Sequence, residues 1–165
     1  MTDTQLLFRI RFWLGVEVAG LVLAGVTAFP LVHESHLLVQ HVHIGFVDRV
    51  AHGLDETSRS YPFLAYGTDW LAFAHLTIAV AFWGPMREPV RNIWVVQFGM
   101  IACAGIIPLA LIAGPVRHIP FWWTCIDMSF GVFGIVPLLL AYRHIRKLAG
   151  HERSRAIKAG VAATA

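Results

Sequence analysis

The chain has 165 residues, of which 57% are apolar and only 14% are charged, and its mean hydropathy is +0.64. These values lie outside the range of soluble globular proteins and predict a single integral membrane domain over residues 1–165. The net charge of +3 excludes a strong nucleic-acid footprint, and Cys103 and Cys125 lie in apolar stretches that indicate neither a disulfide framework nor a zinc motif.

The first apolar run, residues 12–32, predicts a transmembrane helix. At 1.5 Å per residue it is about 31 Å long, which matches a hydrocarbon core of roughly 30 Å. A signal peptide is the alternative, but Glu17 interrupts what would be its apolar centre. We expect Glu17 either to form a structural ion pair, with Arg91 or His144 as its partner, or to snorkel to the membrane boundary, because an acid at this depth needs compensation. The second interpretation is that Glu17 is half of a proton path.

The connection between His33 and Ser60 is the only long one in the chain, and it is rich in histidine. Apolar residues recur in it at helical spacing, which predicts an amphipathic helix over about residues 34–54, lying on the outer membrane surface. The predicted apolar face comprises Val39, Val42, Phe46, Val50 and Leu54. The histidines of this predicted loop region are His33, His36, His41, His43 and His52.

Three further transmembrane helices are predicted at residues 62–83, 93–113 and 119–142. Pro108 is expected to kink the middle one of these, because a proline ring removes a backbone hydrogen bond. The basic tail, residues 143–165, is expected to be a frayed or surface helix that binds anionic lipid. The predicted fold is therefore an all-α, integral membrane four-helix bundle with an amphipathic surface helix between its first two spans.

The distribution of Lys and Arg predicts the orientation of these spans. Ten of the thirteen basic residues fall on the side that carries both termini, and only Arg49, Arg59 and Arg117 fall on the other. By the positive-inside rule, both termini of this multi-pass protein are predicted to be cytoplasmic, in the cell (inner) membrane.

Two carboxylates, Asp69 and Asp127, are predicted to lie on the order of 10–12 Å below the outer ends of their helices, among aromatic residues. If both face inward, they share a proton, hold a cation or are neutralised by Arg117. A buried ion pair within an aromatic belt and a ligand pocket explain these residues equally well. The predicted ligand-binding residues are Tyr66, Asp69, Trp70, Arg117, Trp122, Trp123 and Asp127.

Several histidines are candidate metal ligands. His75 lies near the middle of its predicted span, where a hydrogen bond to a neighbouring helix is the simpler role for a lone imidazole. The spacings of His33 with His36 and of Asp48 with His52 place each pair on one helical face, which suits a divalent metal. A two-histidine haem would need a second imidazole at the depth of His75, and the predicted spans contain none.

Three functions remain open from the sequence. The first is a binding or accessory module whose outer pocket holds an amphiphilic ligand or a partner helix. The second is a membrane enzyme or electron-transfer subunit that uses a divalent metal or haem. The third is a metal-independent enzyme acting on a lipid or quinone, with Asp69 or Asp127 as a proton donor. These two acids and His75, which belongs to the second function, are the candidate catalytic residues.

The expected partners are membrane lipid, with a homo-oligomer or a larger membrane complex suggested by helix faces lined with glycine and alanine. The sequence contains no P-loop, GxSxG, CxxC or Glu-x-x-His motif.

Overall fold

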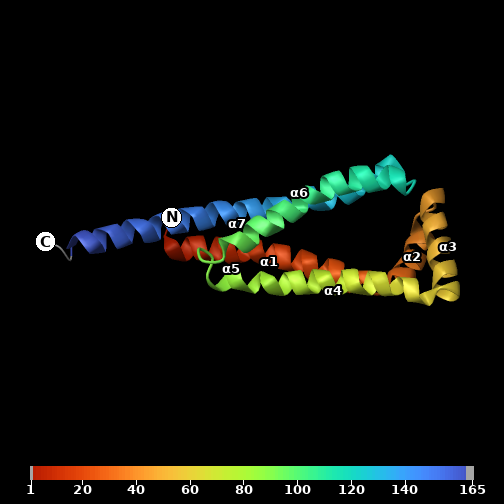
Figure 1. Cartoon of the computed structure of the whole chain (residues 1–165), viewed down its shortest axis with the longest axis horizontal. Helices are drawn as coiled ribbons and strands as arrows, with labels where there is room; N and C mark the ends of the chain where they lie inside the picture. Colours follow the sequence, from red (N-terminus) through yellow and green to blue (C-terminus); the bar gives the residue numbers. More distant parts are fainter. Residues whose placement is uncertain (1, 163–165) are drawn as a thin grey trace. The chain divides into compact units, whose positions relative to one another are not determined.

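The structure is a computed structural model that describes the backbone of residues 2–162 and the side-chain exposure of residues 2–159. All regular elements in the described range are helical (Figure 1), which confirms the predicted all-α class. The elements are α1 (Asp3–Ala28), α2 (Leu31–His41), α3 (Gly45–Ser60), the 3-10 helix η1 (Pro62–Ala65), α4 (Tyr66–Ala81), α5 (Trp83–Arg87), α6 (Ile93–Val116) and α7 (Phe121–Ala162).

Three helical segments are long and apolar enough to cross a membrane. They are Pro62–Arg87, Ile93–Val116 and Phe121–Ala159. A fourth span is added if α1 and α2 are taken as one broken span. The chain therefore has the candidate spans of a multi-pass membrane protein, whereas the bundle arrangement and the sidedness of the termini stay predictions.

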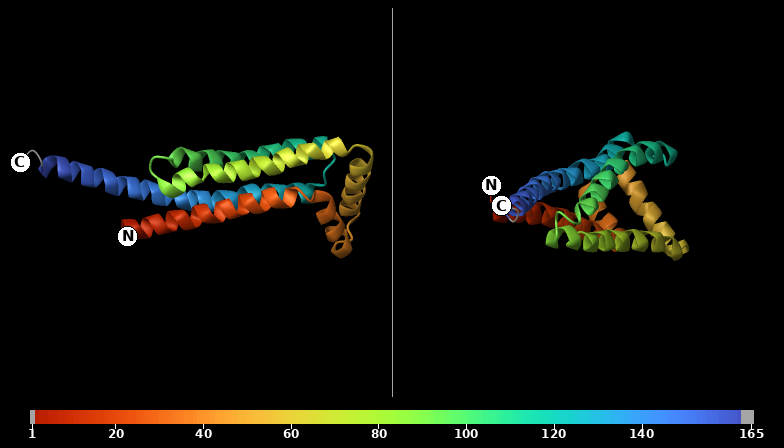
Figure 2. Two further views of the ribbon diagram at one scale, coloured as in Figure 1. Left: turned by 90° about the horizontal axis from the view of Figure 1, so that it is seen from below. Right: turned by 60° about the vertical axis from the view of Figure 1, so that its left-hand side comes forward.

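The predicted C-terminal end of the first helix, residues 12–32, is wrong. Helix α1 ends at Ala28, and the chain turns by 92° into α2 (Figure 2). Pro30 caps the start of α2 and lies inside the predicted helix. Proline cannot donate a helical hydrogen bond and restricts the residue before it, here Phe29, so the helix stops at this point. That α2 lies on the membrane surface stays a prediction.

The single amphipathic helix predicted over residues 34–54 is also wrong, because two helices occupy this region. Val42 and Ile44 have extended backbones that separate α2 from α3. The two helices pack against each other, and the imidazole Nε2 of His36 lies 2.8 and 2.9 Å from the carboxylate oxygens of Asp55. The histidines are therefore mostly helical rather than in a loop, as His33, His36, His41 and His52 illustrate.

The buried face of α3 differs from the predicted one. Val47 and Ala51 are buried, whereas Val50 of the predicted face is exposed. Helix α3 starts at Gly45 and packs against α2. The residues that it buries are therefore those that face α2, and not those that a single continuous helix from Val39 would have buried.

The chain divides into two compact units. The first, called here the α6–α7 unit, comprises the stretch up to Val18 and the stretch from Ala81. The second, the α2–α3 unit, comprises Ala19–Val80. Within the α2–α3 unit, α1 approaches α4 closely, because a Cβ on Gly25 would lie 3.0 Å from the carbonyl oxygen of Ala72.

Glycines allow α6 and α7 to pack closely along the α6–α7 unit. A Cβ on Gly131 of α7 would lie 2.5 Å from the carbonyl oxygen of Cys103, and one on Gly114 of α6 would lie 2.8 Å from Thr124 Oγ1. Real side chains do not tolerate such distances, so only glycine permits this approach. Both helices continue through their internal prolines, which are Pro108 and Pro115 in α6 and Pro137 in α7.

Helix α7 extends far beyond its predicted end at residue 142. It has 42 residues and is therefore about 63 Å long, twice the hydrocarbon thickness of a bilayer. The predicted separate tail, residues 143–165, is thus a continuation of α7 up to Ala162, and its last residues lie outside the described range. Ile145 and Leu148 explain the continuation, because they are buried at helical spacing from Ala141.

Replacing Gly131 with alanine should destabilise the protein by roughly 1–3 kcal/mol, since the added methyl group would clash with the backbone of α6. Gly105→Ala is the matched control, because nothing lies within 4 Å of the corresponding Cβ position. The measurement is unfolding in SDS followed by tryptophan fluorescence. Equal midpoints for the two variants would contradict the observed approach of α6 and α7.

Candidate functional site

A hollow of about 290 Å³ lies between the end of α6 and the beginning of α7. Its wall is mostly apolar and carries one basic and one acidic side chain, so we call it the Arg117–Asp127 hollow. The lining residues are Ile106, Leu109, Ala110, Ala113, Gly114, Arg117, Ile119 and Asp127. Two residues of the predicted pocket, Arg117 and Asp127, are thus on one wall.

The turn after α6 holds Arg117 in place. The amide of Ile119 donates to the carbonyl of Gly114, and the amide of His118 donates to that of Pro115. This is the Schellman pattern of helix termination, with His118 at φ 56° in the position that usually holds glycine. Arg117 therefore lies at the C-terminus of α6, where the helix dipole favours a cation.

Asp127 lies about 9 Å along α7 from Phe121, within the helix's first two turns. Within the described residues, Asp127 and Arg117 form no ion pair with each other or with any other side chain. The carboxylate and the guanidinium are thus separate groups on the wall of one hollow. Trp122 and Trp123 precede Asp127 on α7, and their rings are in edge-to-face contact with centroids 5.4 Å apart.

The other three predicted pocket residues, Tyr66, Asp69 and Trp70, belong to the α2–α3 unit. All three are exposed on α4, and the rings of Tyr66 and Trp70 are in edge-to-face contact at 5.9 Å. Asp69 is in the first turn of α4, where the helix dipole favours an acid. That these residues line one pocket with Arg117 and Asp127 stays a prediction.

Three of the candidate metal ligands, His75, His36 and His52, are already engaged in other contacts. His75 Nδ1 lies 2.8 Å from the carbonyl oxygen of Leu71, to which it donates, so its Nε2 is the ring nitrogen left for another partner. His36 is paired with Asp55, and His52 lies 4.0 Å from Glu56.

No group of three or more His, Cys, Asp or Glu side chains that could hold a metal ion occurs in the part of the chain that the structure describes. His33 and Asp48 are both exposed, on α2 and α3. The hypotheses of a divalent metal and of haem stay predictions.

Glu17 lies where three helices of the α6–α7 unit meet. Its carboxylate oxygens are 3.9 and 4.0 Å from the position a Cβ on Gly134 would take, and Cys103 Sγ is 3.0 Å from the same position. The predicted ion pair is wrong, because Arg91 pairs with Glu88 and the imidazole of His144 bonds to the Leu140 carbonyl. Among residues 2–159, Glu17 has no ion pair or hydrogen bond.

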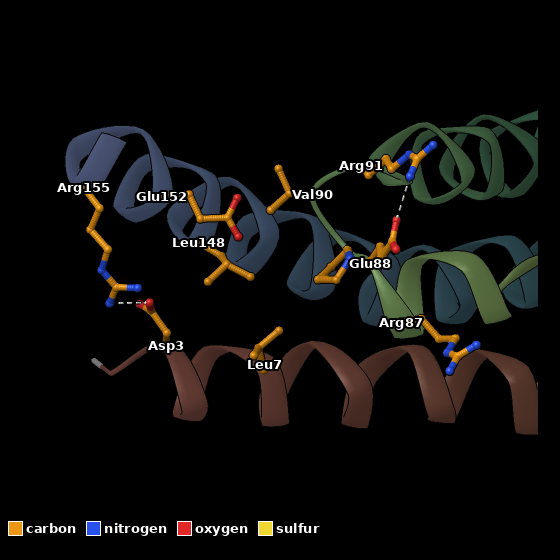
Figure 3. Close-up of a pocket in the computed structure, with 10 residues that line it drawn as sticks. Asp3, Leu7, Arg87, Glu88, Val90, Arg91, Leu148, Glu152 and Arg155 are labelled. Atoms are coloured by element: carbon orange, nitrogen blue, oxygen red, sulfur yellow. Dashed lines mark hydrogen bonds and ion pairs between the residues drawn. The ribbon is translucent and has the colours of Figure 1, made fainter. Parts of the chain in front are cut away.

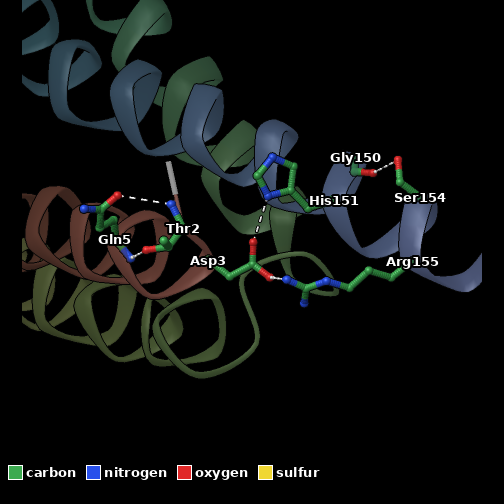
Figure 4. A network of polar contacts seen from close by, with 7 residues as sticks. All are labelled: Thr2, Asp3, Gln5, Gly150, His151, Ser154 and Arg155. Atoms are coloured by element: carbon green, nitrogen blue, oxygen red, sulfur yellow. Dashed lines mark hydrogen bonds and ion pairs between the residues drawn. The ribbon is translucent and has the colours of Figure 1, made fainter.

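Asp3, His151 and Arg155 form a polar cluster at the other end of the α6–α7 unit that was not predicted from the sequence (Figure 4). One carboxylate oxygen of Asp3 accepts a hydrogen bond from His151 Nδ1 at 2.8 Å, and the other lies 2.5 Å from an Arg155 guanidinium nitrogen. These contacts lower the pKa of Asp3, with the His151 hydrogen bond the largest cause. No sequence signal links residues 148 positions apart.

No family model matches the chain, and neither a curated protein nor a solved structure is similar to it. Only its own residues therefore indicate what it binds.

Replacing Asp3 with asparagine should loosen the end of α7, because His151 and Arg155 lose their shared carboxylate. Hydrogen–deuterium exchange of residues 148–158 at pH 7 should be faster in Asp3→Asn than in the control Glu152→Gln. In the wild type, the folded pKa of Asp3 lies below its ordinary value of 3.8. The stabilisation is therefore complete above that pH and is lost as the pH falls through the lower folded value. Unchanged exchange in Asp3→Asn would contradict the contact.

Proposed function

We propose that this multi-pass membrane protein is a binding module for a small amphiphilic ligand, whose polar group lies between Arg117 and Asp127. The observation that supports this function is the placement of an unpaired guanidinium and an unpaired carboxylate on the wall of one otherwise apolar hollow. Ligand sites of this kind combine apolar walls with a few convergent polar groups.

The apolar part of the hollow favours an amphiphile over a water-soluble ligand. Leu109 is 66% exposed on α6, so a ligand seated in the hollow extends along an apolar helix surface. Arg117 is at the helix end, where headgroups reach the chain. A molecule with a polar head and an apolar chain satisfies both regions at once.

The size of the hollow limits the ligand. A volume of about 290 Å³ is at the small end of the range for ligand pockets, roughly 300–1,000 Å³. It accommodates a headgroup with a short chain segment or a single ring. A partner helix would need an extended groove, so a small ligand fits this site better.

The two charged groups set the chemistry of the ligand's head. The guanidinium of Arg117 donates to a carboxylate, phosphate or carbonyl oxygen, and the carboxylate of Asp127 accepts from a hydroxyl or amine. A head that has both an acceptor and a donor is therefore expected. If Asp127 acted as an acid or base in catalysis, the ligand would first have to bind in the same hollow. Ligand binding is therefore required for an enzyme as well as for a binding module.

Native mass spectrometry of the protein extracted in mild detergent should show a bound small amphiphile. Arg117→Gln and Asp127→Asn should each bind it roughly 10- to 100-fold more weakly, since a hydrogen bond to a charged group contributes about 1.5–3 kcal/mol. Arg143→Gln and Asp48→Asn are matched controls, because both parent side chains are exposed and neither lines the hollow.

The thermal unfolding of each variant separates loss of ligand from loss of fold. If folded Arg117→Gln and Asp127→Asn retain the same bound mass at the same occupancy as the controls, the hollow is not the binding site.

A further inference from the structure

A second hollow, of about 480 Å³, lies in the α6–α7 unit near the beginning of α1 and the extension of α7 (Figure 3). Its lining residues include three arginines, Arg87, Arg91 and Arg155. Apolar side chains, among them Leu7, Val90 and Leu148, form another part of the wall. A concave surface with both kinds of lining suits a ligand that has an anionic and an apolar part.

The hollow includes the connection between two candidate membrane spans. Arg87 is the last residue of one candidate span, and the next begins at Ile93. The loop between them, which contains Arg91, forms part of the wall. Side chains at the ends of spans lie among lipid headgroups, and arginine is common there.

This end of the α6–α7 unit is strongly basic. The segments 2–11, 84–92 and 143–159 together contain ten Lys and Arg side chains and only three Asp and Glu. All three acids, Asp3, Glu88 and Glu152, lie on the wall of the hollow itself, so the surrounding excess of positive charge comes from outside it. Such an excess attracts anions to the hollow.

The acids do not neutralise all three arginines. Arg155 forms an ion pair with Asp3 at 2.5 Å, so its guanidinium is not free to bind an anion. Arg91 reaches Glu88 only at 3.4 Å, and both side chains are mostly exposed, so this pair contributes little and can rearrange.

Arg87 has no acidic partner among the described residues, and its guanidinium lies 5.8 Å from the centre of the Trp83 ring. Stacking of this kind leaves the edge of the guanidinium, with its N–H donors, accessible to an anion.

We propose that this hollow binds the phosphate group of an anionic membrane phospholipid, and that Arg87 and Arg91, whose side chains extend to opposite sides of Glu88 in the structure (Figure 3), turn toward it and donate to the phosphate oxygens. Leu7, Val90 and Leu148 then contact the glycerol and the first acyl carbons. Guanidinium groups recognise phosphate through paired hydrogen bonds. Free inorganic phosphate offers the same head chemistry, but it has nothing to bury against the apolar wall.

The test uses the full chain in phosphatidylcholine nanodiscs in which about one lipid in five is phosphatidylglycerol. After transfer to mild detergent, native mass spectrometry measures retained phosphatidylglycerol. The wild type should retain it, and the double variant Arg87→Gln/Arg91→Gln should retain at least about tenfold less, as expected for loss of charged hydrogen bonds. The control, Arg153→Gln/Lys158→Gln, removes the same charge from exposed positions outside the hollow and should bind like the wild type.

Three results overturn the proposal. Equal retention by both double variants would show that only the net charge matters. If Arg87→Lys and Arg91→Lys each retain as much phosphatidylglycerol as the wild type, no guanidinium group is needed. These lysine variants keep the charge and serve if the glutamine variant does not fold. Finally, equal thermal stabilisation of lipid-free protein by inorganic phosphate and by phosphatidylglycerol would assign the site to a soluble anion.

Discussion

The close approach of α6 and α7 is the contact on which the rest of the α6–α7 unit depends. Gly114 and Gly131 leave no room for a side chain, so the two helices meet at Thr124 and at the backbone of Cys103. In a bilayer this packing is not driven by water, and it therefore relies on close van der Waals contact between small residues. The Schellman turn after Val116 then connects two helices whose separation is already fixed.

This packing places polar groups at three levels of the unit. The Arg117–Asp127 hollow lies beside the Gly114–Thr124 contact, with Arg117 on the turn side of that contact and Asp127 on its other side along α7. Glu17 meets Cys103 and Gly134 farther along α7. At the far end, α7 continues past the span, and its histidine and arginine hold Asp3 of α1. Charged groups thus lie at both ends of the unit, with an acid between them.

Hydropathy and length were sufficient to predict the helical class and three of the four predicted spans, because a segment that crosses hydrocarbon must be long and apolar. Local breaks were harder to predict. Pro30 carried a readable signal that α1 ends early, whereas Val42 and Ile44 gave none for the break between α2 and α3. The pairing of Asp3 with His151 joins residues at opposite ends of the chain, so only the tertiary packing reveals it. Arg117 and Asp127 were predicted as site residues from their charge at membrane depth, but the apolar wall around them depends on the turn geometry.

The central claim is that an amphiphile occupies the Arg117–Asp127 hollow, and photo-crosslinking in intact cells tests it most directly. A photoreactive phenylalanine analogue is introduced at Leu109, which lines the hollow, or at Ile112, which is equally exposed on α6 but does not. After irradiation, mass spectrometry of the purified protein identifies the adducts. Occupancy of the hollow predicts one dominant small-molecule adduct at position 109 that is absent at position 112. The same mixture of bulk-lipid adducts at both positions would contradict the claim.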